Sequence, residues 1–323
     1  MISASSPSYK SWPYPLSEIN FLTPKEEENV IFDCFGGVTQ KKYFGSKQEL
    51  LNGKTGNVLE AFTLAYNEDF HAFIDLVGAI ESAKQSFCMV ELGAGYGRWL
   101  ALGANACNLM NKPLGTLIAC EAEPTHYKWM QEHFRDNKLN PENHKLVWGI
   151  VSDQAGSLPF YAGKSDSWYG QSIAQNVIDY GAPASENFLK RIIKKMLGRS
   201  RHSVPDFPDF IDVPCYSLDS LLEKVSLVDF MHMDIQGAEF DVLSTSMETL
   251  NQKVKKIHVG THSPDVEPTK GRDMDLLIYT LFQSHGWENI NRIAPLSQQE
   301  YDGHTVHFVD GVQTWNNPRL QNN

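Results

Sequence analysis

Short apolar runs separated by segments of helical periodicity fill most of the chain. The runs are rich in Val, Ile, Leu, Met and Phe and poor in charge, which is typical of strands buried on both faces of a sheet. They lie at 87–92, 115–121, 144–152, 211–216, 228–233 and 256–263. Between the first two runs, residues 98–111 combine Leu with small residues and predict a helix that lies close on a sheet. This alternation predicts a doubly wound parallel α/β sheet.

Two further segments have helical spacing. Residues 57–86 carry apolar side chains that predict a helix leading into the first strand. After the second strand, Pro124 suits a first helical turn. It is followed by one apolar stripe at i, i+3 and i+7, which we interpret as core and which consists of Tyr127, Met130 and Phe134.

Three segments fall outside this alternation. Residues 1–60 are rich in Pro, Ser, Lys and Glu near the start. They predict a loosely helical extension that caps the substrate cleft or builds an oligomer interface, the alternative being a packing arm. The main domain should span 61–315, with 316–323 as a tail. Within it, 162–214 interrupts the alternation and predicts an inserted lid, of the kind that often lines an active site.

The first part of the lid is aromatic. Just before it, 157–161 should be a short edge strand, because Pro159 cannot donate to a sheet ladder. Trp168 and Tyr169 are suited to stacking on a base or a sugar face, and Gln171 to binding hydroxyls. We therefore predict that they bind substrate, the alternative being an aromatic loop without a ligand.

The second part of the lid is a basic amphipathic helix. Residues 188–197 place their apolar side chains on one half of a helix and four basic side chains on the other. Together with the basic residues up to 201, this is the basic cluster of an acidic chain. It could steer an anionic substrate or contact an acidic membrane surface through 188–201, or be a lid helix with a solvated face.

Composition narrows the class of protein. With 323 residues, 41% of them hydrophobic, the chain can bury a substantial core. A net charge of −11 argues against nucleic acid as partner, because affinity for phosphate backbones comes from clustered Lys and Arg. The five cysteines are scattered without C-x-x-C spacing, so neither a disulfide framework nor a zinc site is indicated. Without a signal-peptide pattern or an apolar run of transmembrane length, we expect a soluble cytoplasmic protein.

A glycine-rich turn follows the first apolar run. Residues 91–97 read E-L-G-A-G-Y-G, in which the glycines let a ligand approach the main chain and the acid stands at the strand's exit. A dinucleotide-binding turn would need a third glycine at the position of Arg98. The spacing instead resembles motif I of the class I S-adenosylmethionine-dependent methyltransferases. The cofactor residues predicted from this turn are Glu91, Gly93, Ala94 and Gly95.

A second acid supports a nucleoside-type ligand. Glu121 ends the second apolar run, where a carboxylate can accept hydrogen bonds from both ribose hydroxyls. The alternative is a solvated loop acid. Ala122 beside it and Ser152 at the end of the third run complete the predicted cofactor site.

The run at 228–233 leads into the most specific motif of the chain. Residues 233–239 read M-D-I-Q-G-A-E, preceded by S-L-D-S at 217–220. This arrangement resembles the FkbM-type methyltransferases, whose signature is a strand followed by D-[VI]-E-G-x-E, and the matching motifs occur in family order within 87–262. Gln236 stands where the family usually has Glu, which puts in doubt any role that needs a carboxylate there, while the acids at both ends of the motif match.

The resemblance implies a fold and an activity. The sheet should have seven strands in a Rossmann-like arrangement, closed by a helix at 274–285 and an antiparallel hairpin, with a last strand at 305–309. The cofactor should be S-adenosylmethionine and the reaction O-methylation of a sugar, glycolipid or related small-molecule hydroxyl, anionic acceptors included. The alternatives are an NAD(P)-binding oxidoreductase and a non-catalytic nucleotide-binding module on the same sheet.

Strand ends indicate where acceptor chemistry should lie, since ligands of open α/β sheets bind at the carboxyl ends of the strands. Asp234 and His262 each end a strand; His262, with an ordinary pKa of about 6.5, is the candidate general base. Asp234 would orient it or contact the acceptor while also bordering the cofactor, and His232 is a weaker candidate. Some sugar O-methyltransferases use Mg²⁺, but one clear carboxylate is too few ligands to predict a metal. The substrate-binding residues predicted are Trp168, Tyr169, Gln171, Gln236 and Glu239.

Overall fold

We describe the protein from a computed structural model. It describes residues 19–47, 69–153, 156–162, 172–173, 210–263, 272–301 and 303–321. The aromatic part of the lid and the basic segment 188–201 therefore lie outside the described residues, as do the first 18 residues of the expected extension.

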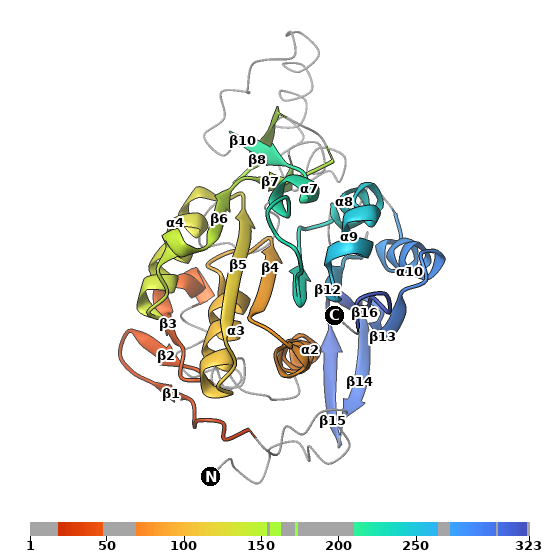
Figure 1. The fold of residues 1–323 in the computed structure, drawn as a ribbon. Helices are drawn as coiled ribbons and strands as arrows, with labels where there is room; N and C mark the ends of the chain where they lie inside the picture. The colour runs from red at the N-terminus through yellow and green to blue at the C-terminus, as the bar shows by residue number, and fades with distance from the viewer. Residues whose placement is uncertain are drawn as a thin grey trace.

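A seven-stranded sheet forms the centre of the molecule (Figure 1). Its strands are β4 (Phe87–Leu92), β5 (Leu114–Glu121), β6 (Lys145–Trp148), β11 (Phe230–Met233), β12 (Lys256–Thr261), β13 (Glu288–Ile293) and β16 (Gly311–Asn316). Across the sheet they lie in the order β6-β5-β4-β11-β12-β16-β13. β16 runs opposite to the other six strands, which are parallel to one another. The predicted doubly wound seven-stranded sheet is confirmed, and the strand order reverses between β4 and β11.

Helices cover both faces of this sheet. They are α2 (Phe70–Ser82), α3 (Arg98–Leu109), α4 (Pro124–Asp136), α7 (Leu218–Leu221), α8 (Glu239–Thr245), α9 (Met247–Lys253) and α10 (Met274–Ser284). Side chains of β4 pack against helices on both faces of the sheet. Phe87 and Met89 belong to one cluster with α2, α3 and α4. Val90 and Leu92 belong to another cluster with α7 to α10. The continuous apolar runs thus reflect burial on both faces.

The N-terminal segment differs from the helical extension expected from its composition. Its described part is a three-stranded antiparallel sheet of β1 (Lys25–Glu26), β2 (Val30–Phe32) and β3 (Val38–Gln40), followed by a 3₁₀ helix at Lys41–Lys47. Asn137, at the end of α4, accepts the Val38 N–H and donates to the Val38 carbonyl, both at 2.8 Å. This side chain completes the hydrogen bonding of the edge strand, a contact that local sequence does not reveal.

The region around the lid forms a second small sheet, in the order β7-β10-β8-β9. It consists of β7 (Ile150–Val151), β8 (Gly156–Tyr161), β9 (Ser172–Ile173) and β10 (Phe210–Tyr216), with β7, β8 and β10 beyond the carboxyl ends of β4 and β5 (Figure 1). The run at 144–152 is therefore two strands, because the chain leaves the main sheet at Gly149, where a side chain would meet the Tyr216 ring. β8 lies between β10 and β9 and is therefore not the predicted edge strand; among the described residues, β9 pairs with Phe160 and Tyr161 and not with Pro159.

The predicted last strand also lies elsewhere. Among the described strands, β15 (His304–Phe308) pairs with β14 (Ser297–Tyr301) alone, in a hairpin that lies at the end of the molecule away from β7, β8 and β10 (Figure 1). The antiparallel place beside β12 belongs to β16, whose Trp315 packs against Phe282 in the core. The residues assigned to a tail begin inside this strand, and the buried Asn317 that follows donates to three backbone carbonyls.

Candidate active site

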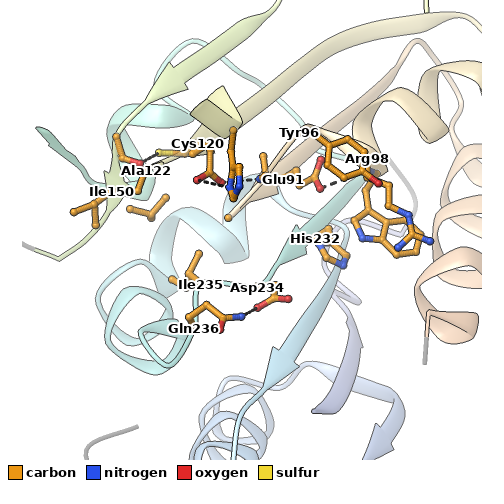
Figure 2. Close-up of a pocket in the computed structure, with 18 of the residues that line it drawn as sticks. Glu91, Tyr96, Arg98, Cys120, Ala122, Ile150, His232, Asp234, Ile235 and Gln236 are labelled. Atoms are coloured by element: carbon orange, nitrogen blue, oxygen red, sulfur yellow. Dashed lines mark hydrogen bonds and ion pairs between the residues drawn. The ribbon is translucent and has the colours of Figure 1, made fainter. Parts of the chain in front are cut away.

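A pocket of about 380 Å³ opens at the carboxyl ends of β4, β5 and β11, where the strand order reverses. Figure 2 shows Asp234 and Gln236 on the other side of this pocket from Ala122 and Ile150. Of the predicted residues, the described wall contains Glu91, Gly93, Ala94, Gly95, Glu121, Ala122, Asp234 and Gln236. Open α/β sheets bind ligands at this point because the connections on either side diverge and leave a crevice.

Packing against Asp234 and α4, apart from any ligand, requires glycine in this turn. Gly93, Gly95 and Gly97 all have positive φ, of 74°, 54° and 72°. A Cβ on Gly93 would overlap the carbonyl oxygen of Asp234, and one on Gly97 would lie 2.9 Å from Met130 of α4. The turn therefore needs glycine at Gly93 to let the end of β11 approach, and at Gly97 to let α4 pack.

Glu91 serves the helix that follows the turn. Its carboxylate is 2% exposed and accepts the N–H groups of Trp99 and Leu100, at 3.4 and 3.1 Å, in the first turn of α3. Burial raises the pKa of Glu91 to about 8, although these two hydrogen bonds oppose the rise. The acid predicted at the strand's exit thus lines the pocket and also occupies the amino end of a helix.

Glu121 holds the glycine turn from the next strand. Its two carboxylate oxygens accept the N–H groups of Gly95 at 2.6 Å and of Glu123 at 2.7 Å. Burial raises the pKa of Glu121, opposed chiefly by the charge of His126. A carboxylate has about four acceptor positions, so each oxygen keeps one for a ligand in the pocket.

Asp234 and His262 are in contact, as their positions at strand ends predict, but only Asp234 lines the pocket. The His262 Nε2 lies 3.2 Å from Asp234 Oδ1, and Gln236 donates to the same oxygen at 3.0 Å. Asp234 lines the pocket with its side chain 43% exposed, whereas the His262 side chain is fully buried and is not part of the described wall. Of these two side chains, Asp234 is therefore the one that faces the pocket.

His262 is surrounded by carboxylates. Its Nε2 lies 3.2 Å from Glu239 Oε1, and its Nδ1 lies 3.1 Å from Asp310 Oδ1. Burial lowers the pKa of His262, but the charge of Glu239 and the contacts with Asp234 and Asp310 outweigh burial and hold it well above its usual value. This raised pKa and the neighbouring carboxylates favour a charged-group contact over the base role that the strand-end position of His262 predicts.

The remaining predicted residues are placed away from the pocket or outside the described chain. Ser152 donates its backbone N–H to the Tyr216 carbonyl and is not on the described wall, although its neighbour Val151 is. Glu239 is completely buried, is not on the described wall and accepts the N–H groups of Ile235 and Gly237. Trp168, Tyr169 and Gln171 lie outside the described residues.

Several lining residues were missed by sequence reasoning. Arg98 forms an ion pair with Asp69 at 2.7 Å and lies 5.0 Å from the centre of the Trp99 ring. Trp99 stacks on His232, whose pKa burial lowers to about 3. In the sequence, Arg98 is notable only because it stands where a dinucleotide-binding turn needs glycine. A sequence signal for its place existed, because the first residue after a glycine turn starts the helix beside the ligand.

No helix in the described part of the chain is long and apolar enough to cross a membrane. Segment 188–201, the predicted membrane-surface contact, lies outside that part.

Residues 91–286 match the family described as Methyltransferase FkbM domain. A protein of Jannaschia sp. (strain CCS1) named "Putative methyltransferase" is 25% identical over 244 residues, covering 75% of this chain and 76% of that protein.

Solved structures show weaker similarity. A methyltransferase FkbM from Methylobacillus flagellatus KT aligns with 13% identity and a TM-score of 0.39, over 71% of this chain and 43% of that one. A precorrin-6y C5,15-methyltransferase from Geobacter metallireducens GS-15 aligns with 11% identity and a TM-score of 0.38, over 81% of this chain and 92% of that one.

Proposed function

This chain belongs to the FkbM methyltransferase domain family and is a methyltransferase, and from this premise we propose that it methylates a hydroxyl of a sugar, glycolipid or related small molecule with S-adenosylmethionine. The NAD(P)-dependent and purely binding alternatives share the same sheet. The choice among these three functions rests on which ligand the glycine turn can bind.

One observation carries the cofactor assignment. In dinucleotide folds the amino end of the helix after the glycine turn binds the pyrophosphate. Here the carboxylate of Glu91 already accepts the Trp99 and Leu100 N–H groups at that end, and Glu121 accepts the Gly95 N–H. These backbone donors are therefore already used and are not free for a pyrophosphate, whereas the acceptor oxygens of Glu121 suit the ribose hydroxyls of a cofactor without phosphate.

The described wall fits the parts of S-adenosylmethionine. Glu121 has acceptor positions for ribose hydroxyls, and Ile150 and Phe160, which pack in one cluster with its neighbour Ala122, supply apolar surface for a purine ring. Gly93 and Gly95 leave the main chain accessible beside the amino-acid part. When bound, the cofactor supplies a methyl group already activated on a sulfonium, so the protein must chiefly place an acceptor oxygen and take up its proton.

Asp234 is the side chain suited to the acceptor. Burial opposes its ionisation, but the close contact with His262 and the charge of that imidazole outweigh burial and lower the pKa of Asp234 to about 2. It is therefore an ionised carboxylate that accepts a hydrogen bond from a hydroxyl, with His262 and Gln236 holding it in place. A neutral hydroxyl is a better match than a group that brings a second negative charge to this carboxylate.

Calorimetric titration tests the cofactor. S-adenosylhomocysteine should bind and NADPH should not, and Glu121→Gln should weaken binding by about 1.5–3 kcal/mol because one charge-assisted acceptor is lost. Glu123→Gln is the matched control, since Glu123 caps α4 and is not on the described wall. Tighter binding of NADPH, or equal losses in both variants, would contradict the assignment.

The acceptor class is tested by mass spectrometry of products from sugars, glycolipids and matched amines. Methylated hydroxyls are expected, and transfer to Asp234→Asn should be slower while its affinity for S-adenosylhomocysteine stays close to that of the parent. Transfer to amines alone would contradict O-methylation.

A further inference from the structure

Three side chains converge behind the pocket at the carboxyl ends of β11 and β12. Asp234 follows β11, Glu239 begins α8 and His262 follows β12. Their ligand atoms all lie within 4.8 Å of one another, and the His262 Nε2 is 3.2 Å from an oxygen of each carboxylate. Donors that share a cation at about 2.1 Å in tetrahedral or octahedral geometry lie roughly 3.0–3.4 Å apart. Both nitrogen–oxygen distances match that spacing.

The nitrogen between the two carboxylates is not satisfied by a hydrogen bond. His262 Nε2 is buried and, despite its short distances to both oxygens, is aligned for a hydrogen bond with neither. Three carboxylates surround this one imidazole, since Asp310 lies on its other side. Even a protonated imidazole would leave this group of four side chains with a net negative charge, which a cation would neutralise.

The partners of the three side chains resemble the surroundings of a metal site. A ligating histidine commonly donates its second ring N–H to a carboxylate, which fixes the tautomer and aims the other nitrogen at the ion. Asp310 Oδ1 lies 3.1 Å from His262 Nδ1 and can fill that role. Glu239 is held by the N–H groups of Ile235 and Gly237, at 2.9 and 3.0 Å, so it is positioned before any ion binds.

We propose that Asp234, Glu239 and His262 bind a divalent first-row transition-metal ion whose free coordination positions face the pocket. Asp234 is the member that lines the pocket, so an ion on it would present these positions to the acceptor. One imidazole with two carboxylates suits Mn²⁺, Fe²⁺ or Zn²⁺ better than Mg²⁺ or Ca²⁺, which prefer oxygen ligands alone. The ion's role rests on the proposed function: it would bind the acceptor hydroxyl and lower the pKa of that hydroxyl. The hydroxyl proton would pass to solvent water as the oxygen bonds to the methyl carbon, and the methyl–sulfur bond would break to release S-adenosylhomocysteine.

Manganese titration of the full chain, stripped of metal by a chelator, tests this site. The six-line electron paramagnetic resonance signal of free Mn²⁺ should disappear as one ion binds per chain. Pulsed measurements on the bound ion should show coupling to a nitrogen, which is lost in His262→Gln. A site made only of surface acids would give no such coupling.

Variants separate the ligands from their surroundings. Asp234→Asn should weaken Mn²⁺ binding by at least the roughly 10–100-fold that loss of an outer partner costs, and Asp310→Asn should fall within that range. Glu248→Gln, an exposed acid on α9, should bind Mn²⁺ like the parent. Because the Asp234 side chain is partly exposed, Asp234→Asn should fold and still test the site if His262→Gln fails to fold.

The outcomes distinguish this inference from the proposed function. Absence of Mn²⁺ binding, equal binding by Asp234→Asn, or absence of nitrogen coupling would overturn the metal site, even if S-adenosylhomocysteine binds in the presence of chelator. Binding of Mn²⁺ with the expected variant pattern but no binding of S-adenosylhomocysteine would uphold the site and overturn the cofactor. Displacement of Mn²⁺ by an equal concentration of Mg²⁺ would overturn the proposed ion class.

Discussion

At the scale of single residues, Gly93 shows how one position serves both fold and site. Its φ of 74° already disfavours a side chain, and the space where a Cβ would lie is filled by the carbonyl oxygen of Asp234. The main-chain turn that borders the cofactor is thus pressed against the residue that should meet the acceptor. Any side chain at Gly93 would push the two apart.

We therefore expect Gly93→Ala to destabilise the protein more than backbone strain alone explains. Gly303 is the matched control, because its φ is 82° and nothing lies within 4 Å of the place of its Cβ. Gly303→Ala should cost about 1–2 kcal/mol of unfolding free energy from left-handed strain. Gly93→Ala should cost about 1–3 kcal/mol more because the clash displaces packed backbone. Urea unfolding measures both, and equal losses would show that the end of β11 yields freely.

At the scale of elements, His133 joins the N-terminal sheet to the main domain. It lies on α4, with Nδ1 3.1 Å from the Tyr96 carbonyl and Nε2 3.3 Å from the Thr39 hydroxyl of β3. A carbonyl only accepts, so Nδ1 carries the proton and Nε2 accepts from Thr39, which is the neutral imidazole. Burial lowers the pKa of His133 to about 4, opposed by its hydrogen bond to Tyr96.

This depressed pKa predicts a loss of stability in weak acid. An unfolded histidine titrates near 6.5, so the stability that neutral His133 provides is present above pH 6.5 and is lost as the pH falls towards 4. The loss is at most about 1.4 kcal/mol per pH unit within this window. His133→Gln removes the titrating group, so the difference in unfolding free energy between parent and variant should shrink from pH 7 to pH 4.5. A difference that stays constant over this range would contradict the neutral assignment.

At the scale of the whole molecule, a buried carboxylate joins the start of the domain to its end. Asp75 of α2 accepts the Thr314 hydroxyl of β16 at 2.6 Å and lies 3.2 Å from the His258 Nδ1 of β12. Burial opposes the ionisation of Asp75, but His258 and the charge of Lys256 outweigh it and lower its pKa. This contact fixes α2 on the half of the sheet that the C-terminal strands complete.

Loss of this carboxylate should destabilise the whole fold in a pH-dependent way. Because the folded pKa of Asp75 lies below the unfolded value of about 3.9, its contribution is complete above that pH and is lost as the pH falls through the folded pKa. Asp75→Asn should cost about 3–5 kcal/mol at pH 7, as breaking a buried ion pair typically does. The difference in unfolding free energy between the parent and Asp75→Asn should narrow below pH 4. Asp136→Asn, at an exposed carboxylate, should stay within about 0.5 kcal/mol.

The sequence by itself determined the elements and the cofactor turn. Apolar runs, the glycines of 91–97 and the acids at 121 and 234 depend on residues close in the chain, because burial on both faces and tight turns leave local patterns. The parallel sheet, its pocket-lining acids and the resemblance that names the family all follow from such patterns.

Only the tertiary structure decided which distant residues meet. β16 and not 305–309 lies beside β12, and the expected helical extension is a paired sheet whose strand β3 is hydrogen-bonded by Asn137 of a distant helix end. The meeting of Asp234, Glu239 and His262 places two carboxylates at one imidazole where the sequence shows a single acid at a strand end. Register and side-chain direction across strands set these contacts, and neither is encoded in any one segment.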